Sequence, residues 1–422
     1  MIFFRFLLKT SRGIGMSVYF WIVVLALEYY SFHAFKTINK STIGWWIYGL
    51  THLSLYGSIL FFSLNEKDGF SSPNFKRLFI LLILFVIPKV FLALTLIFDD
   101  FLRIFKYTFF TPDSDIVDMP GRRKATVWIA LGLASIPFFG VLDGIFKGKY
   151  RFRVIRKTVY FDDLPEAFDG FTITQLSDIH AGSFDNKDKV DYGIKLATKQ
   201  NSDILVFTGD MVNNEASELA PYVEMFSQLE AGQGMYSVLG NHDYGEYGNL
   251  TDEQKKQSVE DLQAMQNRIG FKMLNNSMQT IEVEGQRLNI IGVENWGHAP
   301  FFPKYGDLRK ATENVRDGDF NILLSHDPSH FDHEVTGHDN IINFGKKIHL
   351  TMSGHTHGMQ FGIEIPGLIK WSPSKYRYPN WGGLYENNGR KLYVNRGFGF
   401  LAFPGRVGMW PEITVLELRK KT

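Results

Sequence analysis

The sequence contains no cysteine among its 422 residues. Disulfide bonds, thiolate nucleophiles and cysteine-ligated zinc are therefore excluded, and cysteine usage carries no information about the redox compartment. The chain also lacks a strong net charge, because 45 Lys and Arg offset 44 Asp and Glu and leave +1. A protein that binds nucleic acid through bulk charge would be distinctly basic. We therefore expect no nucleic-acid partner.

Four long apolar runs fill the first third of the chain, at residues 16–35, 43–64, 78–98 and 125–146. Each is close to the ~20 residues that cross a bilayer as a helix. A soluble helix normally keeps a polar face, and a cleaved signal peptide would explain only the first run. We expect residues 1–148 to form a transmembrane region with about four helices, in an integral, multi-pass membrane protein. The lipid bilayer is then a partner of the protein.

The distribution of basic residues favours one orientation. With four spans, both ends of the region lie on one side of the membrane, and the segments on that side carry more Lys and Arg than the opposite ones. The positive-inside rule therefore favours a cytoplasmic domain after the last span. An odd number of spans would reverse this orientation.

Two charged residues, Glu28 and Lys89, lie inside the apolar runs. They could pair with each other, since charges within a membrane are costly. Alternatively, Glu28 lies near an interface and Pro88 divides the third run into two shorter pieces. We favour this second interpretation.

From about residue 149 the composition becomes that of a soluble α/β domain, which we place at residues 149–422. Short apolar segments alternate with helical ones. The predicted strands are residues 171–176, 203–207, 234–239, 279–283, 287–293, 321–324, 349–352, 392–395 and 413–418. The predicted helices are residues 187–199, 215–229 and 251–269.

Residues of metal-ligand type follow five of these strands directly. They are Asp178 and His180, Asp210, Asn241 and His242, His326, and His355 and His357. Each alone could be a helix cap, a turn residue or a structural histidine. Side chains at the carboxyl ends of strands in an open sheet converge, however, so five such ends in one domain favour a shared site.

The candidate ligands combine nitrogen and oxygen donors without sulfur. This set suits two divalent metal ions (Mn, Fe, Zn or Co) better than Ca or Mg, which prefer oxygen alone. Two such ions ~3.5–4 Å apart clamp a phosphoryl group and activate a bridging hydroxide. Asp210, which is central among the candidates, is the natural bridging ligand.

The order Asp-x-His, Gly-Asp, Gly-Asn-His-Asp, Ser-His and Gly-His-x-His resembles the calcineurin-like metallophosphoesterase superfamily, over roughly residues 151–422. Within it, Gly-His-Thr-His-Gly-Met-Gln at residues 354–360 and the tail at residues 393–413 resemble bacterial membrane-associated YkuE/YaeI-type phosphoesterases. The resemblance implies an α/β fold, a four-layer α/β/β/α sandwich, after an all-α transmembrane region. It also implies a dinuclear metal centre.

The resemblance further implies a role for each matching residue. Asp178, His180 and His357 would hold the first metal, and Asn241, His326 and His355 the second, with Asp210 as the bridge. His242 would be the general acid, oriented by Asp243, and with Asn241 it would contact the phosphoryl group. Asn213 and Met359 depart from the usual pattern at positions that are not ligands in the family.

Two features outside the motifs leave alternatives open. Arg396 could bind substrate phosphate or make a structural ion pair, which we favour slightly. The segment 370–381 interleaves basic and aromatic residues. It could contact substrate or a lipid head group, or it could be a solvated loop whose aromatic rings pack on the domain.

Together these features predict a membrane-anchored, metal-dependent phosphohydrolase that cleaves a phosphoester or pyrophosphate bond. Location in a membrane favours a lipid-linked substrate. One alternative is a phosphodiesterase acting on soluble nucleotides. Another is a non-catalytic membrane scaffold, against which the complete ligand set and His242 argue. A transporter is disfavoured by the few spans and the large second domain.

Overall fold

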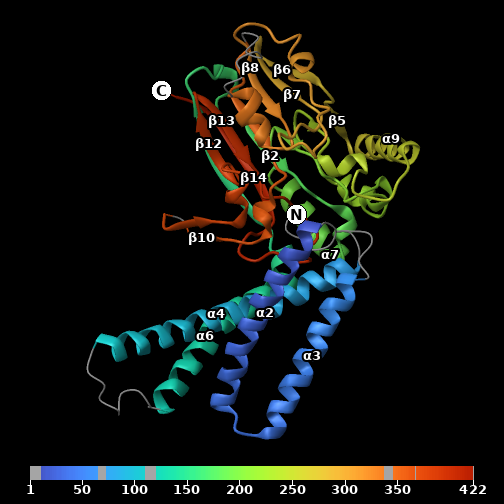
Figure 1. The fold of residues 1–422 in the computed structure, drawn as a ribbon. Helices are drawn as coiled ribbons and strands as arrows, with labels where there is room; N and C mark the ends of the chain where they lie inside the picture. Colours follow the sequence, from blue (N-terminus) through green and yellow to red (C-terminus); the bar gives the residue numbers. More distant parts are fainter. Residues whose placement is uncertain (1–10, 65–72, 110–119, 337–345, 366, 422) are drawn as a thin grey trace. The chain divides into compact units, whose positions relative to one another are not determined.

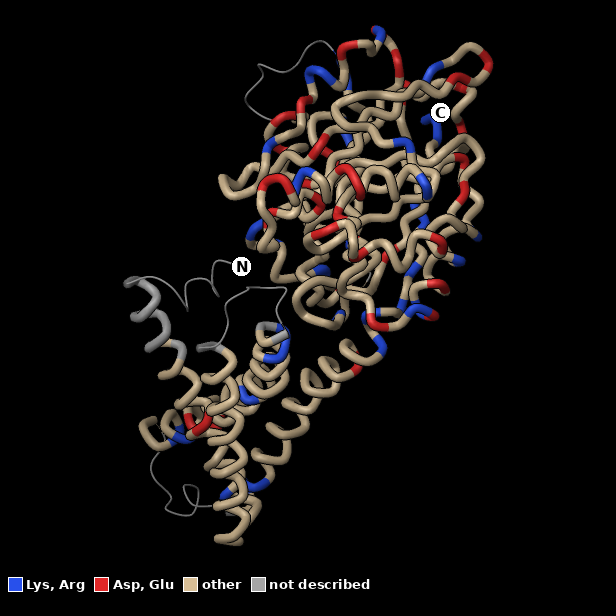
Figure 2. Tube along the Cα trace, turned by 90° about the vertical axis from the view of Figure 1, so that its right-hand side faces the viewer, with Lys and Arg blue, Asp and Glu red and all other residues tan. Residues whose placement is uncertain are grey.

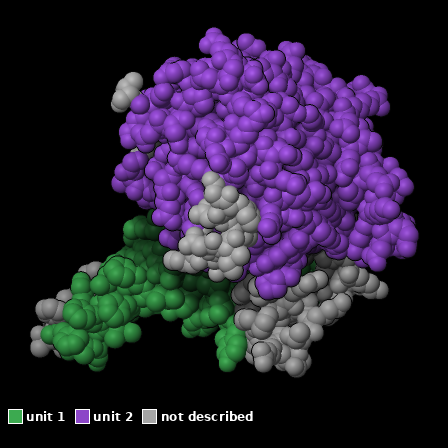
Figure 3. Space-filling model, turned by 90° about the horizontal axis from the view of Figure 1, so that it is seen from above, with its two compact units in different colours: residues 1–143 green, residues 144–422 purple. Residues whose placement is uncertain are grey.

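The computed structural model describes residues 11–64, 73–109, 120–336, 346–365 and 367–421 (Figure 1). The chain divides into two compact units, Met1–Asp143 and Gly144–Thr422, which Figure 3 colours separately. Charged residues are sparse in the first unit and frequent throughout the second (Figure 2). We predicted a domain boundary after residue 148, and it stays a prediction. The division into compact units between Asp143 and Gly144 describes how the chain packs and does not test which part folds on its own. Residues 1–10 and 65–72, which contribute to the orientation argument, lie outside the described part.

The described residues of the N-terminal region form four helices: α2 (Ser11–Ile38), α3 (Thr42–Leu64), α4 (Pro73–Phe109) and α6 (Pro120–Phe146). In the described residues, two helical segments, Lys76–Phe109 and Gly121–Phe146, are long and apolar enough to cross a membrane. The predicted helical region is therefore confirmed, whereas a bilayer crossing by α2 and α3 stays a prediction.

The interpretation that we favoured for Glu28 and Lys89 is wrong. Helix α4 continues through Pro88, and the ammonium of Lys89 pairs with the carboxylate of Glu28. The hydroxyls of Tyr48 and Tyr56, both on α3, donate to the same carboxylate. A buried charge in a membrane is stabilised when it is paired and hydrogen-bonded, and neighbouring helices make proline tolerable there. This cluster thus links α2, α3 and α4.

The second unit is built on two six-stranded sheets. The first has the order β1 (Arg153–Phe161), β14 (Glu412–Lys420), β2 (Thr172–Leu176), β3 (Ile204–Phe207), β4 (Met235–Ser237) and β5 (Phe271–Met273). The second has the order β12 (Gly383–Asn387), β13 (Arg390–Val394), β9 (Leu350–Ser353), β8 (Phe320–Leu324), β7 (Gln286–Gly292) and β6 (Ser277–Val283). Strands β2 to β5 are parallel, and so are β7, β8 and β9.

The apolar core has a layered arrangement. One buried cluster combines Ile173 and Val206 of the first sheet with Ile290 and Ile322 of the second, so the two sheets pack face to face. A second cluster joins the first sheet to α7 (Lys187–Thr198), α8 (Val223–Phe226) and α9 (Asp252–Ile269). A third joins the second sheet to α10 (Leu308–Ala311) and the turn Phe331–Val335. The predicted two-sheet α/β class is confirmed.

One predicted helix, at residues 215–229, is wrong. The chain there forms the 3-10 turns Ala216–Glu218 and Ala220–Tyr222 followed by the short helix α8. Pro221 lacks a backbone N–H, which breaks the hydrogen-bond ladder of a longer helix. Strands β1, β5 and β12 and the hairpin of β10 (Ile363–Ile365) with β11 (Ile369–Trp371) were not predicted.

Candidate metal centre

The predicted ligands lie just beyond the carboxyl ends of strands from both sheets. Asp178 and His180 follow β2, Asp210 follows β3, and Asn241 and His242 follow β4 in the first sheet; His326 follows β8, and His355 and His357 follow β9 in the second. Because these strands are parallel within each sheet, their carboxyl ends meet at one edge.

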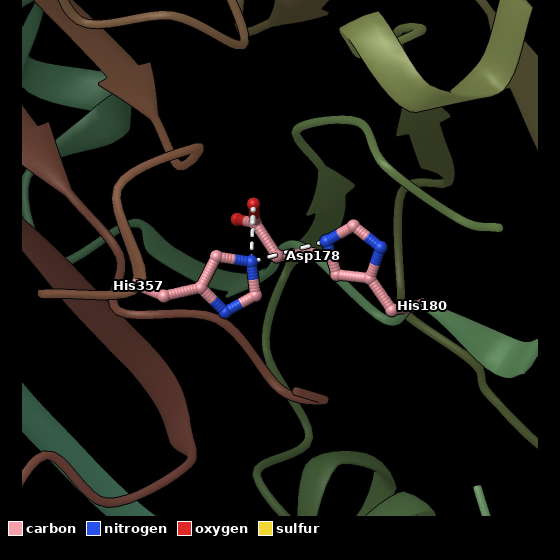
Figure 4. Close-up of side chains that lie close together, drawn as sticks. All are labelled: Asp178, His180 and His357. Carbon is pink, nitrogen blue, oxygen red and sulfur yellow. Dashed lines mark hydrogen bonds and ion pairs between the residues drawn. The ribbon is translucent and has the colours of Figure 1, made fainter. Parts of the chain in front are cut away.

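The side chains form two groups. Asp178, His180 and His357 make one, drawn in Figure 4, and Asp210, His326 and His355 make the other. In the first group, Nε2 of His357 lies 3.1 Å from Nε2 of His180 and 3.2 Å from Oδ1 of Asp178. In the second, Nε2 of His326 lies 3.1 Å from Nδ1 of His355 and 3.2 Å from Oδ1 of Asn241.

Asp210 stands between the two groups. Its Oδ2 lies 3.2 Å from Nε2 of His326 and 3.6 Å from Nε2 of His180. Its Oδ1 accepts a hydrogen bond of 2.8 Å from the backbone N–H of His242. One carboxylate oxygen thus faces both groups, which is the position that a bridging ligand requires.

The backbone is strained at these positions. Asp178, His180, Asp210, His355 and His357 all have φ between 49° and 71°. A residue with a Cβ rarely adopts this left-handed region, which costs of order 1–3 kcal/mol and is concentrated at functional sites. The sharp turns direct the side chains away from the strand direction and toward one point.

Glycines before two of the ligands allow close approach. A Cβ on Gly240 would lie 2.2 Å from Oδ1 of Asp210, and a Cβ on Gly354 would lie 2.2 Å from Oδ2 of Asp178. Any larger residue would therefore displace a carboxylate of the site. These contacts explain why the residues that precede Asn241 and His355 are glycines.

Hydrogen bonds fix the ring nitrogens of two histidines. Nδ1 of His326 donates to the carbonyl of Thr208 at 2.8 Å. Nε2 of His355 donates to the hydroxyl of Tyr378 at 2.8 Å, and that hydroxyl donates to Asp327. The remaining nitrogens, Nε2 of His326 and Nδ1 of His355, therefore face each other with their lone pairs. Only a shared proton or a cation satisfies two such lone pairs.

The charges in the site also suit cations. Burial lowers the pKa of His180 well below its ordinary value and that of His355 to about 4, so both rings are neutral and able to bind metal. Burial alone would raise the pKa of Asp178, but the interaction with the ring of His357 lowers it below the ordinary value. Despite burial, Asp210 raises the pKa of His326 to about 10, which marks a place where positive charge is favoured. Nδ1 of His180 is buried and has no hydrogen-bond partner among the residues that the structure describes. These residues fit a dinuclear metal centre.

Comparisons with known proteins agree with this geometry. Residues 171–359 match the family model described as calcineurin-like phosphoesterase. Residues 12–149 match the one described as probable calcineurin-like phosphoesterase, transmembrane domain. The chain is a calcineurin-like metallophosphoesterase with a transmembrane domain. It is thus a phosphoric ester hydrolase by family, and a membrane protein.

Relatives of this phosphoesterase occur in bacteria and animals. It is 29% identical to the uncharacterized metallophosphoesterase YkuE of Bacillus subtilis, over 61% of this chain and 82% of YkuE. It is 26% identical to an uncharacterized metallophosphoesterase of Helicobacter pylori, over 96% of this chain and 99% of the relative, so the likeness includes the membrane region. It is 25% identical to a transmembrane protein with metallophosphoesterase domain of Danio rerio, over 71% and 64%.

His242 of the phosphoesterase is placed beside the first group. Its ring centroid lies 5.0 Å from that of His180, and the ring of Tyr247 packs on it at 4.3 Å. Nδ1 of His242 donates to the backbone carbonyl of Asn213 at 2.8 Å. Burial lowers the pKa of His242, which Asp210 opposes.

The expected role of Asp243 in orienting His242 stays a prediction. In the described structure its carboxylate accepts hydrogen bonds from the backbone N–H groups of Asp210, Met211, Val212 and Gly240. A carboxylate that accepts from four backbone amides holds a loop in place. Asp243 therefore fixes the Asp210 turn, and the carbonyl of Asn213 orients His242.

Two arginines lie close to the phosphoesterase site, and both are buried. Arg396 pairs with Glu412 at 2.5 Å and with Glu364 at 2.8 Å. Binding of substrate by Arg396 therefore stays a prediction. A substrate phosphate would have to compete with the carboxylates of Glu412 and Glu364 for its guanidinium. Arg406 places Nη2 at 3.0 Å from Nδ1 of His357 and donates from its Nε to the carbonyl of Gly399.

Sequence reasoning missed several neighbours of the ligands. Tyr378 and Asp327 hold His355, while Tyr247 accepts a hydrogen bond of 2.9 Å from Nδ2 of Asn241 and so turns Oδ1 toward His326. Tyr378 lies in the basic and aromatic segment 370–381, and this unusual composition was the feature of the sequence that could have pointed to a residue of the site. Asp327 follows His326 directly. For Tyr247 the sequence offers no signal, since contact with Asn241 depends on a 3-10 turn at Asn241–Tyr244.

Proposed function

We propose that this phosphoesterase hydrolyses a phosphoester or pyrophosphate bond at a centre of two divalent metal ions. The observation that carries the proposal is the position of Asp210, whose Oδ2 faces His180 of one Asp/His group and His326 of the other. In the proposal Asp178, His180 and His357 hold one ion, Asn241, His326 and His355 hold the second, and Asp210 is shared. Mn, Fe, Zn and Co all suit this donor set.

When bound, the two ions would polarise the phosphoryl group and activate the attacking water. The protein supplies the remaining chemistry. Because Nδ1 of His242 donates to Asn213, Nε2 is the ring atom that delivers a proton to the departing oxygen. Tyr247 and Tyr378 keep Asn241 and His355 in the orientation that the ligands need.

The location of the reaction forms a further part of the proposal. Basic residues in the segments flanking the helices favour a cytoplasmic catalytic unit at the bacterial inner membrane. Attachment to a membrane favours a lipid-linked phosphoester or pyrophosphate over a freely diffusing one. The alternative substrate class is a soluble nucleotide, which the same ligands would accept.

The test uses the full-length protein purified in detergent. Bis-p-nitrophenyl phosphate and p-nitrophenyl phosphate are assayed with Mn²⁺ and with a chelator, and next a nucleotide-linked glycolipid in mixed micelles is assayed. Metal-dependent turnover of the diester supports the proposed reaction, and the Asp210→Asn variant should lose it together with bound metal. Metal bound at full stoichiometry without turnover of any of these substrates would favour the scaffold alternative.

A further inference from the structure

The hairpin of β10 and β11 projects from the body of the second unit (Figure 1). In its register Ile363 pairs with Trp371, Glu364 with Lys370, and Ile365 with Ile369. Side chains alternate between the faces of a strand, so paired residues share a face. One face of the hairpin is therefore entirely apolar, and the other carries Glu364 and Lys370.

The polar face of the hairpin is bound to the catalytic unit. Glu364 pairs with the buried Arg396 at 2.8 Å. Lys370 donates to the carbonyl of Gly382 at 2.5 Å and lies over the rings of Trp381 and Tyr385. These contacts prevent the hairpin from turning its apolar face inward.

The apolar face is consequently exposed. Ile363, Ile365, Ile369 and Trp371 are 51%, 47%, 44% and 37% exposed, and Leu368 at the turn is 74% exposed. Glu364 and Lys370 on the other face also keep exposed surface, so solvent reaches both faces of the hairpin. Contiguous exposed apolar side chains mark a surface that binds a membrane or a protein.

Hydrogen bonds connect the base of the hairpin to the end of a membrane helix. The N–H of Gly362 donates to the carbonyl of Val407 at 3.0 Å, and the N–H of the adjacent Arg406 donates to the carbonyl of Gly144 at 3.1 Å. Gly144 lies in the last turn of the apolar segment Gly121–Phe146 and belongs to the same compact unit as the hairpin. Within the second unit, the base of the hairpin is therefore connected to the residues Gly144–Phe146, with which α6 ends.

A basic cavity adjoins the same helix end. Its volume is about 700 Å³, and Phe146, Lys147, Lys149, Arg151 and Lys189 line it together with Pro404. Asp185, which pairs with Lys149, is the acidic residue in its lining. Clustered Lys and Arg beside a membrane helix attract anionic lipid head groups.

We propose that the β10–β11 hairpin inserts its apolar face into the bilayer that α6 enters, with anionic lipid head groups in the adjoining basic cavity. This proposal rests on the membrane region and not on the reaction. Strand β11 continues through the turn Pro373–Tyr376 to Tyr378, which binds the candidate ligand His355. The inserted hairpin would thus hold the metal centre at the bilayer surface. A metal centre at the bilayer surface would favour a phosphoester on a membrane amphiphile as the substrate class. This second step rests on the proposed function.

The absence of native cysteine allows a direct test. Leu368→Cys in the full-length protein is labelled with an environment-sensitive fluorophore and reconstituted into vesicles of phosphatidylcholine and phosphatidylglycerol. Inclusion of lipid brominated in the acyl chains should quench the label at least twofold. The matched control is Glu282→Cys, at an exposed position of β6. Strand β6 lies away from the hairpin (Figure 1). Its label should not be quenched.

Two variants refine the test. Ile365→Asp in the Leu368→Cys background should abolish the quenching, because a charge on the apolar face opposes insertion. Lys189→Glu should reduce the dependence of quenching on phosphatidylglycerol. Equal quenching at Leu368 and Glu282 would overturn the proposal. A second outcome would also overturn it: bromolipid does not quench the label at Leu368→Cys, and the label becomes shielded from iodide as the protein concentration rises. That result would indicate that a second copy of the protein covers the apolar face. Because no turnover is measured, failure of the proposed reaction would not affect the result.

Discussion

The guanidinium of Arg406 lies 3.0 Å from Nδ1 of His357, a candidate ligand of the first metal. The same side chain donates to the carbonyls of Arg396, Gly399 and Met409, and it is fully buried. Its backbone N–H donates to Gly144, near the end of α6. Arg406 therefore connects the metal centre to the segment that leaves the membrane helix.

This arrangement predicts that Arg406→Lys weakens metal binding at the first site. An ammonium group cannot reproduce the fork of a guanidinium, which donates to the carbonyls of Arg396, Gly399 and Met409 and so holds the loop that packs beside His357. Residues that orient a ligand typically contribute 10–100-fold to metal affinity. Calorimetric Mn²⁺ titration measures the change, and Arg419→Lys at an exposed ion pair is the control. An unchanged affinity would limit Arg406 to a role in packing.

His242→Gln should reduce turnover by about 10²- to 10⁴-fold, the contribution typical of a general acid. The metal content should stay unchanged, because His242 is outside both Asp/His groups. Metal analysis and turnover of bis-p-nitrophenyl phosphate on one sample separate the two effects. His298→Gln, at a ring stacked on His333, is the matched control. Full activity of His242→Gln would remove this residue from the mechanism.

Tyr378→Phe should lower metal affinity at the second site, again by about 10–100-fold. The substitution removes the hydroxyl that accepts from Nε2 of His355 at 2.8 Å and so frees the ring to rotate. Tyr376→Phe provides a control two residues away, at a side chain that is 76% exposed. Metal titration of both variants is informative, since equal affinities would show that Tyr378 does not hold His355.

The surroundings of His349 predict that the folded protein loses stability in acid. Its Nδ1 accepts from the backbone N–H of Asn321 at 2.9 Å, its ring stacks on Phe320, and burial lowers its pKa to about 4. The unfolded chain takes up this proton near the ordinary pKa of 6.5, so between pH ~6.5 and ~4 only the unfolded state is protonated. The contribution of His349 is complete above pH ~6.5 and decreases by roughly 3 kcal/mol as the pH falls to ~4.

His349→Gln should remove this part of the pH dependence. Thermal unfolding of the full-length protein in detergent, measured from pH 7 to pH 4, gives the difference between the two proteins. His298→Gln should follow the wild type. Parallel curves for wild type and His349→Gln would show that His349 is not the group responsible.

The ion pair between Glu28 and Lys89 predicts a non-additive effect on stability. Lys89→Met leaves the carboxylate of Glu28 without its counter-charge between apolar helices and should lower the unfolding temperature in detergent. Glu28→Gln combined with Lys89→Met removes both charges and should restore much of the loss. An additive double variant would mean that the two residues do not interact in the folded protein.

The sequence was sufficient for features that depend on local pattern. Apolar runs long enough to span a bilayer indicated the helical region, and alternating short apolar segments indicated β2, β3, β8 and β9. Polar residues directly after these strands indicated the candidate ligands, because parallel strands bring their carboxyl ends together. Local pattern failed where a single residue outweighed it, as at Pro221 in the segment predicted as one helix.

Only the tertiary structure decided which groups hold the ligands and which face of an element is exposed. The carbonyl of Asn213 orients His242, and Asp243 holds backbone amides, because hydrogen bonds to the backbone depend on how distant loops meet. The pairing of Glu28 with Lys89 required α2 and α4 to pack together. From the sequence alone, the apolar residues of the β10–β11 hairpin would be predicted to lie in the buried core. They are exposed because Arg396 and Gly382, brought close by folding, bind the opposite face.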